Sequence, residues 1–242
     1  MSIIKNHKGQ IIQNLDDWKC IYSTGQREKH WKEGRSAYAI ADFVINHNGL
    51  YHIRSRIEEI IHQDIGFLET IPEFEIRFDK FGRGRVHDLA IRGETESNQN
   101  VFVGVEAKVD ESFGPTISEV YLDAKARDIS GDRTRVPQRI DQLLKKQFKK
   151  IDRSAFDLRY QLLYSVAGTI AAKSDISVLY IIVFRTNLYD DLIGAENYKD
   201  YLTFLNAVAA IEQDSSRPGS RVYNFKLGRK ELLSIYEQVD LK

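Results

Sequence analysis

Two acidic residues and a lysine lie in segments where charged side chains are rare. Asp88 stands inside the apolar segment 86–91, and Glu106 and Lys108 follow the apolar segment 101–105. A charged side chain is costly to place in a strand that faces a core. Two neighbouring carboxylates also repel each other unless a cation or a proton lies between them. These residues therefore indicate a site that binds a cation.

The oxygen atoms of this set suit a hard divalent cation. Mg²⁺ binds carboxylates, backbone carbonyls and water, and a lysine beside it can position a metal-bound water or stabilise a pentavalent phosphorus centre. The alternative is that Asp88 and Glu106 face solvent while Lys108 pairs with an acid on a neighbouring strand. Glu106 and Lys108 share their strand face with Phe102 and Gly104 rather than with polar residues, which favours the cation site.

Three predicted strands carry these side chains. Residues 73–78 alternate between apolar and polar, and residues 85–92 and 101–109 follow as strands. The turn KFGRG and the polar loop GETESNQN separate them. This order predicts an antiparallel meander in which Asp88 can come close to Glu106.

The surroundings of Asp88 follow from the same patterns. Because strand side chains alternate between faces, Asp88 is expected to share a face with Val86 and Ala90. An amphipathic helix is predicted for residues 51–64, before the meander, and Glu58 borders its apolar stripe. An acid at that position can face the same site as the strands.

The rest of the chain predicts further elements around this unit. A small strand and a helix are expected in the first thirty residues, followed by a helix from Ser36 to the Asn48-Gly49 pair. Further helices are predicted at 116–127, 137–150, 154–172, 198–213 and 229–238, and further strands at 176–185 and 222–227. The strand at 176–185 is apolar throughout, as in a sheet covered on both faces. The class is therefore α/β or α+β, with a central mixed sheet and helices on its faces.

The arrangement resembles a known family of enzymes. The pattern Asp-(x)17-Glu-x-Lys, on consecutive strands after an acid-bearing helix, resembles the PD-(D/E)XK superfamily of restriction-endonuclease-like nucleases. The predicted order from Tyr51 to Arg185 is similar to that family's αβββαβ core. The resemblance implies an α/β fold with a mixed central sheet flanked by helices. It also implies Mg²⁺-dependent cleavage of phosphodiester bonds in DNA, less often RNA, with Mn²⁺ as a substitute ion.

Carried over by position, the resemblance assigns roles to individual residues. Asp88 and Glu106 become metal ligands, Ala107 contributes a backbone carbonyl, and Lys108 lies next to the nucleophilic water. Many members place a glutamate on the first core helix, and Glu58 is the matching choice.

Three further positions bear on the resemblance. Glu59 is the second choice for the helix glutamate. Gln161 matches a glutamine that some members carry on the helix after the third strand, although its surroundings lack the Gln-x-x-x-Tyr spacing of one branch. His87 stands where the family name has a proline.

Charge is balanced overall but not locally. The chain has 35 basic and 35 acidic residues, so composition alone gives no support for nucleic-acid binding. Residues 133–153 carry eight basic and two acidic residues, and such a stretch can grip a phosphate backbone. It can equally be the solvated face of an amphipathic helix. The candidate nucleic-acid contacts are Lys80, Arg83, Arg85, Arg133, Arg135, Arg139, Lys145 and Gln161.

Composition narrows the remaining function classes. The single cysteine, Cys20, excludes an intrachain disulfide and suits a reducing cytoplasm. The longest apolar run, 178–184, is too short to cross a membrane. Phosphate-loop, zinc-site and serine-hydrolase motifs are absent. We therefore expect one domain over 1–242, with flanking elements at 1–50, a core at 51–185 and an extension at 186–242. It is expected to act on DNA, and a homodimer would suit cleavage of both strands. The rival interpretation is a non-catalytic binding or regulatory protein that retains the fold.

Overall fold

The computed structural model describes residues 2–23, 29–213, 217, 219–228 and 230–241. Its central feature is one eight-stranded sheet with the order β1-β2-β3-β4-β5-β8-β7-β6. The strands are β1 (Ile3–Ile4), β2 (Ile65–Ile76), β3 (Arg85–Thr95), β4 (Asn100–Lys108), β5 (Ile176–Arg185), β6 (Ile211–Gln213), β7 (Ser220–Leu227) and β8 (Lys230–Asp240). The N-terminal, central and C-terminal parts of the chain all contribute to this sheet.

The sheet is mixed, as the sequence predicted. Strands β2, β3 and β4 form the expected antiparallel meander. Strands β4, β5 and β8 run parallel to one another, and β7 and β6 return antiparallel. The carboxyl ends of β4, β5 and β8 therefore meet at one edge.

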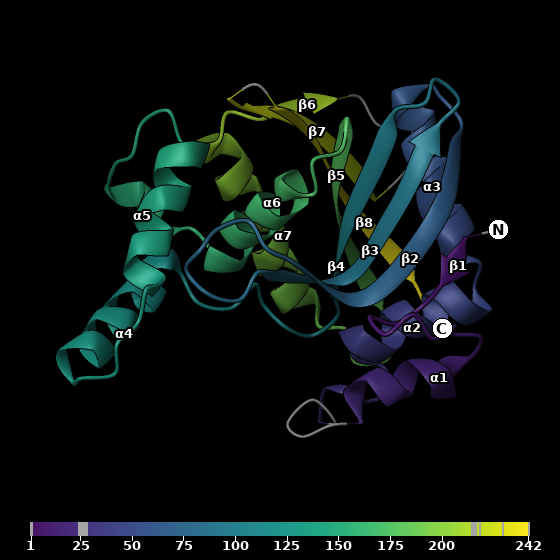
Figure 1. The fold of residues 1–242 in the computed structure, drawn as a ribbon, viewed down its shortest axis with the longest axis horizontal. Helices are drawn as coiled ribbons and strands as arrows, with labels where there is room; N and C mark the ends of the chain where they lie inside the picture. The colour runs from purple at the N-terminus through teal and green to yellow at the C-terminus, as the bar shows by residue number, and fades with distance from the viewer. Residues whose placement is uncertain (1, 24–28, 214–216, 218, 229, 242) are drawn as a thin grey trace.

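Helices cover both faces of the sheet. The helices are α1 (Leu15–Lys19), α2 (Ser36–Asn46), α3 (Gly49–Ile61), α4 (Ile117–Ile129), α5 (Val136–Gln147), α6 (Tyr160–Ala171) and α7 (Asp191–Ala207), with short 3-10 helices at Cys20–Tyr22 and Arg153–Asp157. In Figure 1, α4 and α5 lie on the side of the molecule away from α3 and β1. Among the described residues, no helix has both the length and the apolar character needed to cross a membrane.

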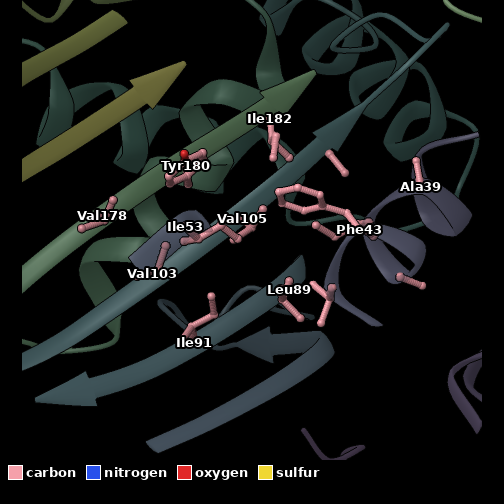
Figure 2. Close-up of a cluster of buried hydrophobic side chains, with 14 of the residues drawn as sticks. Ala39, Phe43, Ile53, Leu89, Ile91, Val103, Val105, Val178, Tyr180 and Ile182 are labelled. Atoms are coloured by element: carbon pink, nitrogen blue, oxygen red, sulfur yellow. The ribbon is translucent and has the colours of Figure 1, made fainter. Parts of the chain in front are cut away.

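Two apolar cores, one on each face, hold these layers together. On the first face, Phe43 of α2 and Ile53 of α3 pack against Leu89, Val103 and other strand residues (Figure 2). The second core joins α4 to α7 with alternate residues of β5, β7 and β8. Because β5 is apolar at nearly every position, it contributes to both cores, which confirms the prediction of a strand with both faces covered.

The C-terminal segment differs from the prediction. A closing helix was expected at 229–238, but Lys230–Asp240 is strand β8, paired with β5 and β7. Leu232 packs into one core and Leu233 into the other. The short apolar cluster Leu232, Leu233, Ile235 and Tyr236 has a spacing that also fits one face of a helix, so the pattern alone did not separate the two.

Several boundaries also moved. Strand β2 begins at Ile65, so Pro72 lies inside it rather than at its start. Helix α6 begins at Tyr160, because Asp152 caps a separate 3-10 turn over Arg153–Asp157. Helix α7 starts at Asp191, where the Asp190 side chain accepts bonds from the first backbone amides.

Candidate functional site

The candidate site lies where β3 and β4 separate. Their paired residues run from Glu94 and Asn100 to Leu89 and Val105 and stop there. Beyond this point Asp88 Oδ2 accepts a hydrogen bond from the Ala107 backbone amide at 2.8 Å. The Asp88 side chain thus replaces a backbone acceptor and keeps β3 attached to β4 at the point where the two strands separate. We call this point the gap.

Strand β3 changes face at Asp88. In a regular strand His87 and Leu89 would share a face. Leu89 packs into the core under α2 and α3, whereas the His87 ring lies on the other face, where a Cβ added to Gly104 would meet its Cε1 at 2.7 Å. The expectation that Asp88 shares a face with Val86 and Ala90 is therefore wrong, because alternation is interrupted at this residue.

The neighbouring strand carries a matching irregularity. Glu73 of β2 lies opposite Asp88, between the pairs Pro72–Leu89 and Phe74–His87. Its φ of +51° falls in the left-handed region, which is costly for a residue with a side chain and is found where surrounding structure enforces it. Tyr22 donates a hydrogen bond to the Glu73 carboxylate at 2.7 Å. Two adjacent strands thus depart from regular geometry at the same level.

The Glu106 carboxylate is enclosed by donors. It is 1% exposed. Arg85 binds it with two nitrogens, one of them Nε at 3.1 Å from Oε1. His87 Nδ1 lies 3.1 Å from Oε1, and Gln161 Nε2 donates to Oε2 at 3.1 Å. Because a carboxylate only accepts, His87 carries its proton on Nδ1.

Lys108 is held by the same glutamine. Its Nζ donates to Gln161 Oε1 at 3.2 Å and lies 5.4 Å from the centre of the Phe113 ring. The lysine is 5% exposed. Gln161, in the first turn of α6, therefore links Glu106 to Lys108.

The pKa values of the Asp88 and Glu106 carboxyl groups shift in opposite directions. Burial, the charge of Glu106 and the charge of Glu73 raise the pKa of Asp88 to about 8. Burial also acts to raise the pKa of Glu106, but the Arg85 guanidinium and the His87 ring outweigh it and lower that pKa to about 2. Glu106 is thus ionised and compensated, while Asp88 lacks enough positive charge nearby to ionise at neutral pH.

Burial lowers the pKa of His87, so this residue is neutral. Its Nε2 has no hydrogen-bond partner among the described residues. The ring packs against Gly104 and Gly168, where a side chain would collide with it. His87 therefore acts as a fixed donor to Glu106.

The structure does not bring Glu58 or Glu59 to this group. Glu58 Oε1 accepts the Ile65 amide at 2.8 Å, at the far end of α3. Glu59 pairs with Arg56 and Arg217. The additional acid near Asp88 is Glu73. Glu58 was chosen because it borders the apolar stripe of its helix. That pattern shows which side of α3 Glu58 is on, but it does not show how α3 lies relative to the sheet.

The basic residues divide into paired and exposed groups. Arg139 is buried and forms a two-point ion pair with Asp79 at 2.8 Å, and it also contacts Tyr164. Arg85 forms an ion pair with Glu106. The exposed group comprises Lys80, Arg83, Arg133, Arg135 and Lys145. Arg139 therefore stabilises the fold through its contacts with Asp79 and Tyr164, whereas the exposed group is accessible to a phosphate backbone.

Among the described residues, no cluster of three or more histidines, cysteines and carboxylates is arranged to hold a metal ion. The carboxyl groups of Asp88 and Glu106, which act on each other electrostatically, are the oxygen groups that could hold a metal here. Mg²⁺ is commonly held by one or two carboxylates with water filling the other positions. This donor set therefore suits Mg²⁺ better than a metal that needs several protein ligands.

Comparison with known proteins gives one family. A family model described as a domain of unknown function (DUF6946) matches residues 11–229, most of the 242-residue chain. The chain belongs to the DUF6946 family. A search of curated proteins and a search of solved structures each found no match. The DUF6946 match includes both carboxylates of the site, Lys108 and Gln161.

In this DUF6946 member, sequence reasoning missed the roles of Glu73, Arg85 and His87. The register that puts Glu73 opposite Asp88 is set across the loop 77–84, which is too long for a two-residue turn to fix the pairing. Nothing local indicates the left-handed backbone of Glu73. The pairing of Arg85 with Glu106 joins residues 21 positions apart, which only the sheet register decides.

Proposed function

We propose that this protein is a nuclease of the PD-(D/E)XK type that hydrolyses phosphodiester bonds in DNA with Mg²⁺. The observation that carries the proposal is the meeting of Asp88, Glu106 and Lys108 where β3 leaves β4. The order of α3, the β2–β4 meander, the helices α4 to α6 and β5 parallel to β4 supports it, since it follows the αβββαβ order that the resemblance implies.

The fit of a divalent cation rests on the charge of the site. Asp88 is an acid whose pKa is raised to about 8 by burial and by two neighbouring carboxylates. A divalent cation between Asp88 and Glu106 would relieve this repulsion and return Asp88 to its ionised form. The Ala107 carbonyl would complete the protein's share of the ligands.

Each residue then has a role in hydrolysis. When bound, Mg²⁺ supplies a Lewis acid and an acidified water molecule. Lys108, held in place by Gln161, presents an ammonium that can orient the attacking water and offset charge on the phosphate. The exposed residues Lys80, Arg83 and Lys145 would hold the DNA backbone. Cleavage of both strands would need two sites, which a homodimer could supply.

The test is cleavage of supercoiled plasmid with Mg²⁺ or Mn²⁺. Wild-type protein should convert plasmid to nicked or linear forms, and Asp88→Asn and Lys108→Ala should each reduce the rate by about a hundredfold or more. Asp123→Asn and Lys125→Ala on the exposed part of α4 are matched controls and should cut normally. A Lys108→Ala protein that cuts at the wild-type rate would refute the assignment.

One observation favours a second candidate, a non-catalytic protein that retains this fold. The Glu106 carboxylate already receives hydrogen bonds from Arg85, His87 and Gln161. A carboxylate satisfied in this way can be purely structural. In that case the site holds the sheet together and binds no metal.

Replacement of Arg85 distinguishes the two candidates without an activity assay. Arg85→Gln leaves the buried Glu106 charge uncompensated, so the variant should be less stable in chelator. If Glu106 is a metal ligand, Mn²⁺ should raise the melting temperature of the variant more than that of the wild type. An equal response of both proteins to Mn²⁺ would favour the structural role.

A further inference from the structure

A cavity lies at the opposite end of α6 from the candidate site. It has a volume of about 500 Å³ and is bounded by the end of β2, by α5, by the last turns of α6 and by the ends of β7 and β8. Gln161 lies nine positions before Ile170, which lines the cavity, so about 14 Å of helix separates the two places. This volume falls in the range of small-molecule sites.

The inner walls of the cavity are formed by apolar side chains. They include Leu143 of α5, Ala167 and Ile170 of α6, and Leu227 of β7, with Phe78 at one side. The side chains of Ala167 and Ile170 are only partly buried, so apolar surface remains open in the cavity. An apolar body would gain from covering this surface.

The rim carries only positive charge among the described residues that line it. Arg77, Lys146, Lys173 and Lys230 contribute four cations, and no carboxylate is present. Lys230 Nζ already donates to the Ile170 carbonyl at 3.0 Å. Lys146 and Lys173 form no ion pair with any described residue, and Arg77 reaches Glu75 only at 3.7 Å. Positive charge is therefore available to a ligand.

Two further features of the lining residues point to a ligand in this cavity. Gln147 is 7% exposed, and its Oε1 is buried without a hydrogen-bond partner among the described residues. Lys173 has a φ of +59°, a conformation at helix ends that glycine or asparagine usually takes. A strained lysine and an unsatisfied buried carbonyl both border the same apolar cavity.

We propose that this cavity binds a small molecule that joins an aliphatic body to an anionic head group. The body would lie between Leu143, Ile170 and Leu227, and the carboxylate or phosphate would be bound by Lys146, Lys173 and Arg77. This site does not depend on the proposed nuclease activity, because none of its residues belongs to the group around Glu106.

The test uses decanoate as the probe and 1-decanol as its uncharged match, by isothermal titration calorimetry on the full chain. Wild-type protein should bind decanoate at one site, and 1-decanol about tenfold more weakly or not at all. The double variant Lys146→Glu/Lys173→Glu should weaken decanoate binding by about tenfold or more. Lys149→Glu/Lys150→Glu, the same charge change at exposed positions outside the cavity, should bind as the wild type does.

Two further variants separate the possible failures. Ala167→Trp fills the cavity without altering charge and should abolish decanoate binding, with its melting curve showing that it is folded. Lys108→Ala should bind decanoate normally, whether or not the chain is a nuclease. The proposal is overturned if wild-type protein shows no saturable binding, or if the double variant binds decanoate unchanged. It is also overturned if the basic rim binds a short oligonucleotide and no decanoate.

Discussion

Replacement of Asp88 by asparagine should make the protein more stable and less active at neutral pH. The side chain keeps its size, and asparagine Oδ1 can still accept the Ala107 amide that Asp88 accepts at 2.8 Å. What changes is the charge. Asp88 is partly buried beside Glu106 and Glu73, and this environment raises its pKa from 3.8 to about 8.

The size of the effect follows from that pKa difference. Below pH 4 the carboxyl is protonated in the folded and the unfolded chain, so it contributes nothing to pH dependence. Between pH 4 and pH 8 only the unfolded chain ionises, and the wild type loses about 1.4 kcal/mol of unfolding free energy per pH unit relative to the variant. The difference is about 4 kcal/mol at pH 7 and levels off at about 6 kcal/mol above pH 8. Both figures are upper values, because Asp88 is only partly buried and solvent screens its charge.

The measurement is urea unfolding of both proteins in chelator from pH 4 to pH 8.5. The two free energies should coincide near pH 4 and separate as the pH rises, with asparagine the more stable. Glu106→Gln is the informative contrast, because the pKa of Glu106 is lowered to about 2. It should be less stable than the wild type at pH 7 and should approach it only as the pH falls through 4.5 toward 2. Parallel curves for wild type and Asp88→Asn would refute the charge repulsion described for Asp88.

Three further substitutions test the supports of the site. Gln161→Ala removes the amide that bridges the glutamate and the lysine, and plasmid cleavage should slow by about tenfold or more while the melting temperature changes little. Arg139→Met leaves Asp79 buried without its partner and should lower the free energy of unfolding by about 3–5 kcal/mol in urea. Gly104→Ala places a Cβ 2.7 Å from the His87 ring and should cost about 1–3 kcal/mol in the same assay, whereas Gly66→Ala, whose Cβ would meet no atom closer than 3.9 Å, should cost less.

The central elements could be predicted because their signals are local. The strand predicted at 73–78 corresponds to the end of β2, which stops at Ile76, and the apolar strand predicted at 176–185 is β5. The helix predicted at 229–238 was wrong, because the spacing of Leu232, Leu233, Ile235 and Tyr236 also fits one face of a helix. Only the place of this segment between β5 and β7 makes it a strand.

The sequence named Asp88, Glu106, Lys108 and Gln161 as candidates, but it placed Glu58 with them and missed the roles of Glu73, Arg85 and His87. Gln161 reaches the group from α6, which follows β4 only after α4 and α5. The change of face at Asp88 could not be predicted, since it depends on a left-handed residue in the adjacent strand β2.

By itself the sequence determined which chemical groups the chain offers and how neighbouring side chains alternate, because backbone preference and side-chain period act over a few residues. The tertiary structure alone decided the partner of each charged group. Arg139 is bound by Asp79, 60 positions away, and Arg85 by Glu106 across the sheet. Such pairs form only when packing excludes water from segments distant in the chain, and the burial that pairs some cations leaves others exposed for a ligand.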